Sequence, residues 1–97
     1  MSSEIMARVW QNSQAGGDKL LLLLALADGA DGDGLVIVNK PLLADKCRRS
    51  VKGIERALEE LERANELVRR GNLAVILAGR DRDEGETVLR RWEVGNE

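Results

Sequence analysis

The segment that follows residue 50 carries the clearest hydrophobic pattern in the chain. Val51, Ile54, Leu58 and Leu61 are separated by three, four and three positions, which places them on one stripe of an α-helix. Ser50 stands immediately before this stripe, and its hydroxyl can accept a hydrogen bond from an amide of the first helical turn. The pattern therefore predicts a capped amphipathic helix that buries one face.

Charge changes sign along this predicted helix, which extends over residues 51–65. Residues 46–56 contain five lysines or arginines and one glutamate, whereas residues 57–66 contain four glutamates and one arginine. Lys52 and Arg56 stand four positions apart on the outward face, a like-charge spacing that slightly destabilises an isolated helix. Because an anionic partner would relieve this repulsion, we interpret the segment as a recognition helix.

Weaker patterns precede and follow this helix. Upstream, they predict an N-terminal arm or short helix within 1–16 (Ile5, Met6, Val9, Trp10) and a central buried helix over 18–27 that is capped by Asp18. A strand over 35–38 follows, and then a helix over 41–47 that is capped by Asn39 and has Pro41 in its first turn. Downstream of residue 65 the hydrophobic period changes from 3.6 to 2, which is typical of strands. It predicts strands over 67–70, 73–78 and 87–94, where Val88, Trp92 and Val94 alternate, with a polar turn over 79–86.

Composition describes one small domain with an aliphatic core. The 97 residues are 43% hydrophobic and 33% charged, and Trp10 and Trp92 are the only aromatic residues. Such a chain is globular rather than disordered. The net charge of −2 is not that of a generally basic protein, so any contact with nucleic acid must come from a local patch.

Few kinds of chemistry fit the residues present. There is no histidine and one cysteine, Cys47, so a histidine base and an internal disulfide are excluded and a reducing, cytoplasmic setting is favoured. The Asp-Gly-rich stretch 28–34 fails as a calcium loop, because Ala30 and Asn39 would stand at its third and twelfth positions; a solvent-facing turn fits better. With no nucleophile–base pair, we expect no enzyme activity, metal or cofactor. The longest aliphatic run, 20–27, is too short to span a bilayer.

The order of the predicted elements resembles that of the winged helix-turn-helix superfamily. The residues that carry the resemblance are Val9–Ala15, Leu22–Asp28, Leu43–Ala44 and Ser50–Glu62. Within that superfamily, the sequence is similar to the DNA-binding modules of phage and plasmid replication initiators and of small transcriptional regulators. The resemblance implies an α+β fold, with a three-helix core followed by a C-terminal β-hairpin wing over 67–94.

Carried over to this sequence, the resemblance places the helix that begins at Ser50 in a DNA major groove and the 79–86 loop against the backbone or minor groove. The implied DNA contacts are Arg48, Arg49, Ser50, Lys52 and Arg56, with Arg80 and Arg82 from the wing. Arg56 is the candidate for a guanine edge, and the other basic residues before it are candidates for phosphates. Gly53 departs from the family pattern, which has a side chain there, and costs about 1 kcal/mol of helix propensity.

Each of these side chains also has a structural interpretation. The basic cluster can be a solvated helix face, and Arg56 can pack its stem on the hairpin and pair with Glu59 or Glu60. Trp92 is interpreted as a core residue against the first helix, and Trp10 as a core or subunit-interface residue. Cys47 is interpreted as a small buried hydrophobe.

Two functions from different classes follow. The first is a sequence-specific binder of double-stranded DNA, acting in transcription regulation or replication initiation, and working as a homodimer because one small module contacts few base pairs. The second is a winged-helix protein–protein interaction or dimerisation module without direct DNA binding. The acidic balance of the chain and the apolar segment 5–10 motivate this alternative.

Overall fold

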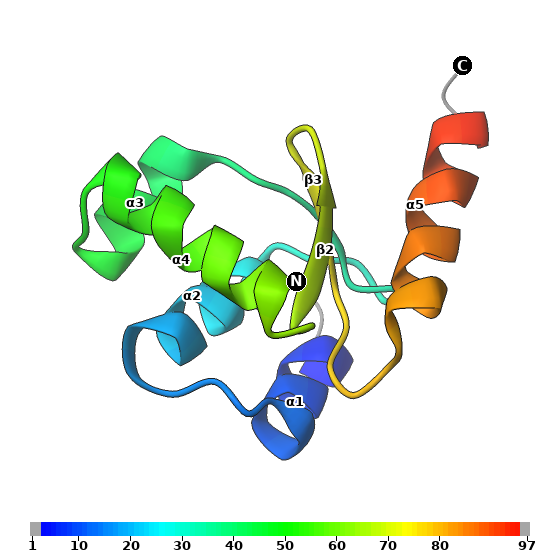
Figure 1. Cartoon of the computed structure of the whole chain (residues 1–97), viewed down its shortest axis with the longest axis horizontal. Helices are drawn as coiled ribbons and strands as arrows, with labels where there is room; N and C mark the ends of the chain where they lie inside the picture. The colour runs from blue at the N-terminus through cyan, green and yellow to red at the C-terminus, as the bar shows by residue number, and fades with distance from the viewer. Residues whose placement is uncertain (1–2, 96–97) are drawn as a thin grey trace.

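The fold is α+β, and the computed structural model describes residues 3–95. Within that range the chain forms five helices and a three-stranded antiparallel sheet (Figure 1). The elements are α1 (Ser3–Asn12), α2 (Gly17–Asp28), β1 (Leu35–Ile37), α3 (Lys40–Cys47), α4 (Val51–Arg63), β2 (Leu67–Arg70), β3 (Leu73–Ile76) and α5 (Arg82–Gly95). The predicted α+β class is thereby confirmed.

The sheet has the order β1-β3-β2, so β3 lies in the middle. Both neighbours pair with it antiparallel, with Val36 opposite Ala74 and Val68 opposite Val75. The β2–β3 connection is a two-residue turn that begins at Gly71. Gly71 has a φ of 60°, the left-handed conformation that tight hairpin turns require and glycine adopts without strain.

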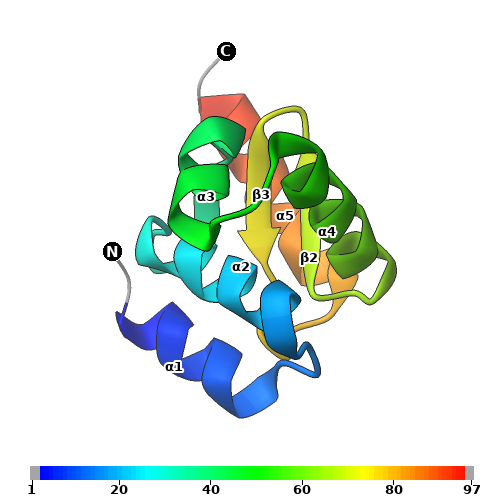
Figure 2. The ribbon, with the colours of Figure 1, turned by 90° about the vertical axis from the view of Figure 1, so that its left-hand side faces the viewer.

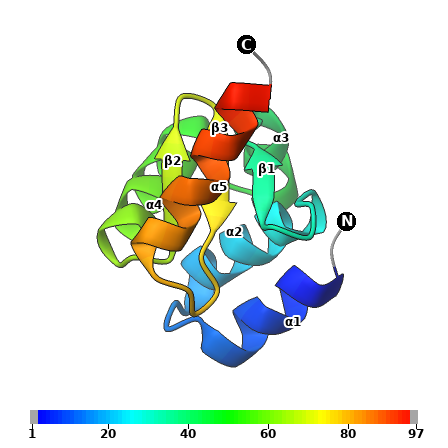
Figure 3. The same ribbon diagram turned by 90° about the vertical axis from the view of Figure 1, so that its right-hand side faces the viewer.

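Side chains alternate across the sheet and supply two hydrophobic cores. On one face, Leu67 and Ile76 pack with buried residues of α1 to α4. On the other, Val68, Val75 and Leu77 pack with Val88 and Leu89 of α5. Figure 3 shows α5 lying across this second face, with α2 and α4 behind the sheet. Successive side chains of a strand point to opposite faces of the sheet, so β2 and β3 each contribute residues to both cores.

Local capping agrees with two of the three predicted caps. The Ser50 hydroxyl accepts a hydrogen bond from the Gly53 amide at 3.0 Å, and the Asn39 side chain accepts one from the Leu42 amide at 3.1 Å. The predicted cap of α2 is wrong, because Gly16 occupies the N-cap position without a side-chain bond and Asp18 lies in the first turn.

The N-terminal segment is a helix rather than an arm. Ile5 and Val9 of α1 are buried in the core formed with α2. The connection to α2 is held by Glu66, which follows α4: its carboxylate accepts hydrogen bonds from the Ser13 hydroxyl at 2.9 Å and the Gln14 amide at 3.1 Å. Glu66 is only 8% exposed, so this polar contact is part of the interior.

The predicted hairpin over 67–94 is wrong in its second half. The hairpin ends with β3, and the segment predicted as a turn and a third strand forms α5. Its buried residues Gly85, Val88 and Leu89 have helical spacing. The Asp81 carboxylate accepts a hydrogen bond from the Glu84 amide at 2.9 Å, a capping contact that starts the helix.

Neither tryptophan is a core residue. Trp10 lies on α1 with 63% of its surface exposed, and Trp92 lies on α5 with 38% of its surface exposed. Trp92 borders a hollow beside Leu35 and Leu73 of the sheet, rather than packing against the first helix as predicted. The larger part of the core is therefore aliphatic, as the composition indicates.

Candidate nucleic-acid interface

Helices α3 and α4 are joined by three residues and face the viewer in Figure 2. The chain leaves α3 through Arg48, whose φ of 54° is left-handed, and it enters α4 three residues later. The amides of Arg48 and Arg49 donate to the carbonyls of Asp45 and Ala44, closing the end of α3. Both helices pack on α2, so the short connection has a fixed geometry.

Helix α4 buries one face and turns its basic face outward. Ile54, Leu58 and Leu61 are almost completely buried, as the spacing predicts, whereas Val51 at the start of the stripe is 44% exposed. Lys52 and Arg56 are exposed. Among the described residues, neither side chain forms an ion pair or hydrogen bond. The alternative pairing of Arg56 with Glu59 or Glu60 is therefore not formed.

The single carboxylate of residues 46–56 is engaged elsewhere. Glu55 accepts a hydrogen bond from the Lys40 ammonium of α3 at 2.8 Å. This hydrogen bond, and then the positive charge of Lys40, hold the pKa of Glu55 below its ordinary value. Because Glu55 is turned toward α3, its charge is compensated there and does not pair with Lys52 or Arg56.

Two other cations of residues 46–56 are tied to α2, and one of them, Arg49, is a predicted DNA contact. Arg49 forms a hydrogen-bonded ion pair with Asp18, and the Lys46 ammonium lies 3.7 Å from the carboxylate of Asp28. Arg48 is exposed, and its side chain makes no polar contact with the described part of the chain. The structure thus brings Arg48, Lys52 and Arg56 to one end of α4 with their charges open to solvent, whereas Arg49 braces the turn.

The acidic half of α4 is compensated within the fold. Glu60 pairs with Lys19 of α2 at 3.1 Å, and Glu62 pairs with Arg69 of β2 at 3.0 Å. Each pair joins α4 to an element against which it packs. Two of the three glutamates in the second half of α4 are therefore ion-paired with neighbouring elements, whereas Glu59 is exposed and the first two turns carry the unpaired cations.

Gly53 lies close to the exposed side chains of the two residues that precede α4. A Cβ atom there would lie 3.3 Å from the Ser50 hydroxyl oxygen and 3.4 Å from Nε of Arg49. The Arg49 side chain therefore lies over the first turn of α4 on its way to Asp18. A small side chain at Gly53 would require these two exposed neighbours to shift by only a few tenths of an ångström.

The predicted wing contacts, Arg80 and Arg82, are not on a hairpin tip. Arg80 donates hydrogen bonds to the carbonyls of Leu77 at 3.0 Å, Asp33 at 2.8 Å and Ile76 at 2.5 Å. It thereby fastens the loop before β1 to the end of β3. Arg82 begins α5 on the opposite side of the sheet from α4. The prediction that these two residues lie on the tip of a hairpin wing is therefore wrong, because the chain forms α5 there.

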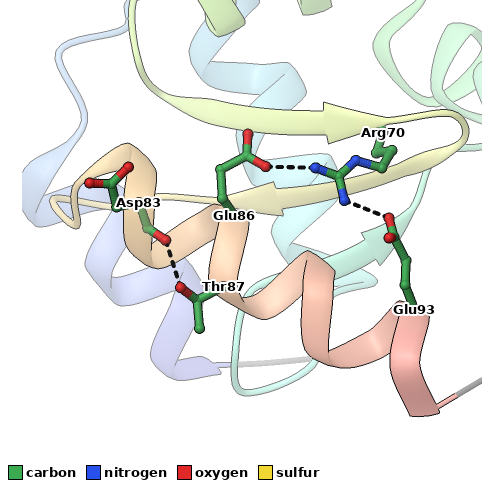
Figure 4. A network of polar contacts seen from close by, with 5 residues as sticks. All are labelled: Arg70, Asp83, Glu86, Thr87 and Glu93. Carbon is green, nitrogen blue, oxygen red and sulfur yellow. Dashed lines mark hydrogen bonds and ion pairs between the residues drawn. The ribbon is translucent and has the colours of Figure 1, made fainter.

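Arg70, which sequence reasoning passed over, lies next to the true hairpin turn. Its guanidinium donates to Glu86 at 2.8 Å and to Glu93 at 2.7 Å, both on α5 (Figure 4). The hydrogen bond to Glu93 is the main reason that the pKa of Arg70 is raised. In the same region the Thr87 hydroxyl donates to the Asp83 carbonyl at 2.9 Å, within α5. Arg70 therefore clamps α5 to the sheet and is not an open cation.

Cys47 is buried at the end of α3, as predicted. Burial raises the pKa of its thiol, and the nearby Arg49 opposes this only in part. A thiol with a raised pKa is mostly protonated near neutral pH and is a poor nucleophile. Cys47 therefore serves as packing between α3 and its neighbours.

Comparison of the chain with models of protein families, with curated proteins and with solved structures gives no match. No helix within residues 3–95 combines the length and apolar character needed to cross a bilayer.

Proposed function

We propose that this protein binds double-stranded DNA with α4 in the major groove. The observation that carries the proposal is that Lys52 and Arg56 project from the first two turns of α4 and pair with no carboxylate of the described chain. The positive end of the helix dipole lies at the same place. A phosphate or base edge there would relieve the repulsion between two adjacent cations.

We further propose that the fold is a winged helix. In this arrangement α2, α3 and α4 form the three-helix core, and β2–β3 is the wing, with its tip at Gly71 and Asn72 rather than at 79–86. The support is the element order, the packing of α3 and α4 on α2, and the pairing of β1 with β3. The α5 helix is an addition that covers the outer face of the sheet.

We propose different roles for the basic residues. Arg56 stands within the helix, where a guanidinium can reach a guanine edge with two hydrogen bonds. Lys52 and Arg48 stand at the helix start and in the turn, positions suited to phosphate contacts that fix the register. The protein acts by occupying its site, in transcription regulation or replication initiation, with no chemistry of its own.

The test is a selection of bound duplexes from a random pool, followed by titrations of the selected duplex at several salt concentrations. Lys52→Ala should reduce the slope of log K against log salt by about one unit, the share of one phosphate contact. The matched control is Arg63→Ala, which removes one exposed charge from the other end of α4 and should leave the slope unchanged. Failure to select any duplex, or equal losses in both variants, would contradict the proposal.

Arg56→Lys separates base reading from phosphate binding. The variant keeps the charge but cannot form the bidentate contact. We expect discrimination at one base pair to fall by about 1–3 kcal/mol, with little change in affinity for non-specific duplex. A uniform loss over all sequences would instead make Arg56 a phosphate contact.

A further inference from the structure

The β2–β3 hairpin carries two charged residues, and both are paired within the fold. Residues 67–76 contain Arg69 and Arg70 and no other charged side chain. Arg69 pairs with Glu62 of α4, and only 16% of its side chain is exposed. Arg70 ends β2 directly before the turn at Gly71, and 48% of its side chain is exposed. The hairpin therefore has one cation at its surface, and that cation is already occupied.

Two carboxylates of α5 hold this one guanidinium. Nη2 of Arg70 donates to Glu86 at 2.8 Å, and Nη1 donates to Glu93 at 2.7 Å. The two glutamates are seven positions apart, about two helical turns, so both project from the same face of α5 toward Arg70 (Figure 4). These three residues are called the Arg70 cluster. Because it combines one positive and two negative charges, the cluster is negative overall.

The ion pairs of the Arg70 cluster are a minor part of what docks α5 on the sheet. Helix α5 buries Val88 and Leu89 in the second core, and the close approach of Gly85 brings its backbone against that core. Surface ion pairs contribute little to stability beside such apolar contacts. The presence of a second carboxylate on a guanidinium that one carboxylate would neutralise therefore calls for an explanation other than stability.

The Arg70 cluster lies beside the surface that the proposed function assigns to DNA. Figures 1 and 2 show the β2–β3 turn and the start of α4 at the same upper end of the molecule. Gly71 of the turn shares a hollow with Lys40 of α3, and Lys40 pairs with Glu55 of α4. Glu55 stands between Lys52 and Arg56, the two exposed cations of α4 that are unpaired within the described chain. An open cation next to the turn would extend this positive surface onto the hairpin.

The donors of Arg70 that now bind carboxylates are those that would bind a phosphate. A guanidinium grips either anion through two N–H groups. Glu86 and Glu93 occupy these groups, and the excess negative charge of the cluster repels a phosphate that approaches the turn. A phosphate that displaced them would leave two carboxylates of α5 without a cation. Arg70 therefore stays with α5 as long as both carboxylates are charged and in place.

We infer that α5 is an autoinhibitory element, in which Glu86 and Glu93 occupy the guanidinium of Arg70 and withhold it from a DNA phosphate. The inference rests on the proposed DNA binding, and it adds a contact that the described state of the protein keeps closed. Neutralising the two carboxylates should open that contact and raise affinity, whereas a purely structural clamp would yield no gain in binding when it is broken.

Titrations of a selected duplex at several salt concentrations test the inference with the double variant Glu86→Gln/Glu93→Gln. It removes both negative charges and keeps the length of both side chains. The slope of log K against log salt should steepen by about one unit, and affinity should rise about fivefold at about 0.15 M salt, the share of one additional phosphate contact. Adding Arg70→Ala to the double variant should abolish both gains, because no guanidinium is left to be released.

The matched control is Asp83→Asn/Glu84→Gln, which removes the same charge from the first turn of α5. Neither carboxylate has an ion pair within the described chain, so no cation is released and affinity should change less than about twofold. Far-ultraviolet circular dichroism and an unchanged urea m value establish that each variant keeps the fold. If the double variant is disturbed, Glu93→Gln alone makes the cluster neutral and should still tighten binding in a way that Arg70→Ala reverses.

Three results would overturn the inference while leaving the proposed DNA binding in place. They are an unchanged affinity and slope in Glu86→Gln/Glu93→Gln, an equal gain when Arg70→Ala is added, and an equal gain in the Asp83→Asn/Glu84→Gln control. The last two would reduce the effect to net charge. Absence of duplex binding in the wild type and in every variant would overturn both proposals.

Discussion

Replacing Gly85 with alanine should destabilise the protein, although alanine favours helix over glycine. Gly85 lies in α5 where the helix rests on the sheet. A Cβ atom there would stand 2.6 Å from Cδ2 of Leu77 and 2.9 Å from Cγ2 of Val68. Both neighbours are 1% exposed and cannot swing into solvent. The substitution must therefore lift α5 from the sheet or force its neighbours from their rotamers.

The magnitude follows from two opposing terms. Overpacking a filled core by one methyl group costs about 1–3 kcal/mol, and the glycine-to-alanine change returns about 1 kcal/mol of helix propensity. Since two contacts lie well inside van der Waals distance, the upper half of the first range applies. The net loss of unfolding free energy should be about 1–2 kcal/mol, or a fall in Tm of several degrees for a domain of this size.

Gly53→Ala is the matched control, the same substitution in the interior of α4. The new Cβ atom would lie 3.3–3.5 Å from the Ser50 hydroxyl oxygen and the Arg49 guanidinium. Both side chains are exposed at the helix surface and can move by a few tenths of an ångström. We expect a gain of up to about 1 kcal/mol, so the two variants should differ in sign.

Urea denaturation followed by far-ultraviolet circular dichroism measures both effects, with an unchanged m value as the check that the same transition is compared. If Gly85→Ala were neutral or stabilising, α5 would not rest on Val68 and Leu77 as closely as described. If Gly53→Ala were as destabilising as Gly85→Ala, the position of Arg49 over α4 would be more rigid than its exposure implies.

Two further predictions concern polar contacts. Glu66→Ala should cost about 1–3 kcal/mol in urea denaturation, because two partly buried hydrogen bonds, from the Ser13 hydroxyl and the Gln14 amide, lose their acceptor. Glu66→Gln, which keeps an oxygen acceptor, should cost less; equal costs would contradict this account. Lys40→Ala should raise the pKa of Glu55 toward its ordinary value in a carboxyl NMR titration, since Lys40 holds it down. The contribution of this pair is present above the ordinary glutamate pKa and is lost as pH falls through the lowered one; an unmoved titration would refute the pairing.

Periodicity predicted the chain closely as far as β3. The helix over 18–27 is one residue longer at each end, and the helices and strands from 35 to 76 begin within one residue of their predicted starts. The prediction works there because each segment buries a single face, and burial imposes the period of the element. Caps at Asn39 and Ser50 add local hydrogen-bond signals that do not depend on the rest of the fold.

The failure at α5 has a specific cause. Val88, Trp92 and Val94 suggest alternation only if Leu89 is ignored, and Leu89 is completely buried. Gly85, Val88, Leu89 and Trp92 have the helical spacing of three, one and three. The β-branched Thr87 and Val88 and the expectation of a C-terminal wing favoured the strand. The segment forms a helix because it packs on the second face of the sheet, and no local pattern reveals that contact.

The roles of the basic residues were predictable only in part. The outward direction of Lys52 and Arg56 follows from helical spacing. The pairing of Arg49 with Asp18 joins residues 31 positions apart, and that of Arg80 with the Asp33 carbonyl joins residues 47 apart. Such contacts depend on tertiary packing, so the sequence could not show which of these cations are paired within the fold and which are open to a ligand.

The arrangement of charge on α4 sets what kind of DNA binding this acidic chain can show. Long-range attraction is weak, because the net charge is −2 and ionic screening limits each charge to about 8–10 Å. Affinity must then come from contacts made after docking, and those are available because Glu60 and Glu62 form ion pairs with Lys19 and Arg69 of the same chain. We therefore expect association rates near the unsteered range of about 10⁵–10⁶ M⁻¹s⁻¹ that change little with salt, while dissociation accelerates with salt. A strongly salt-dependent association rate would show that the positive end of α4 acts at long range, and would contradict the local compensation described for its acidic end.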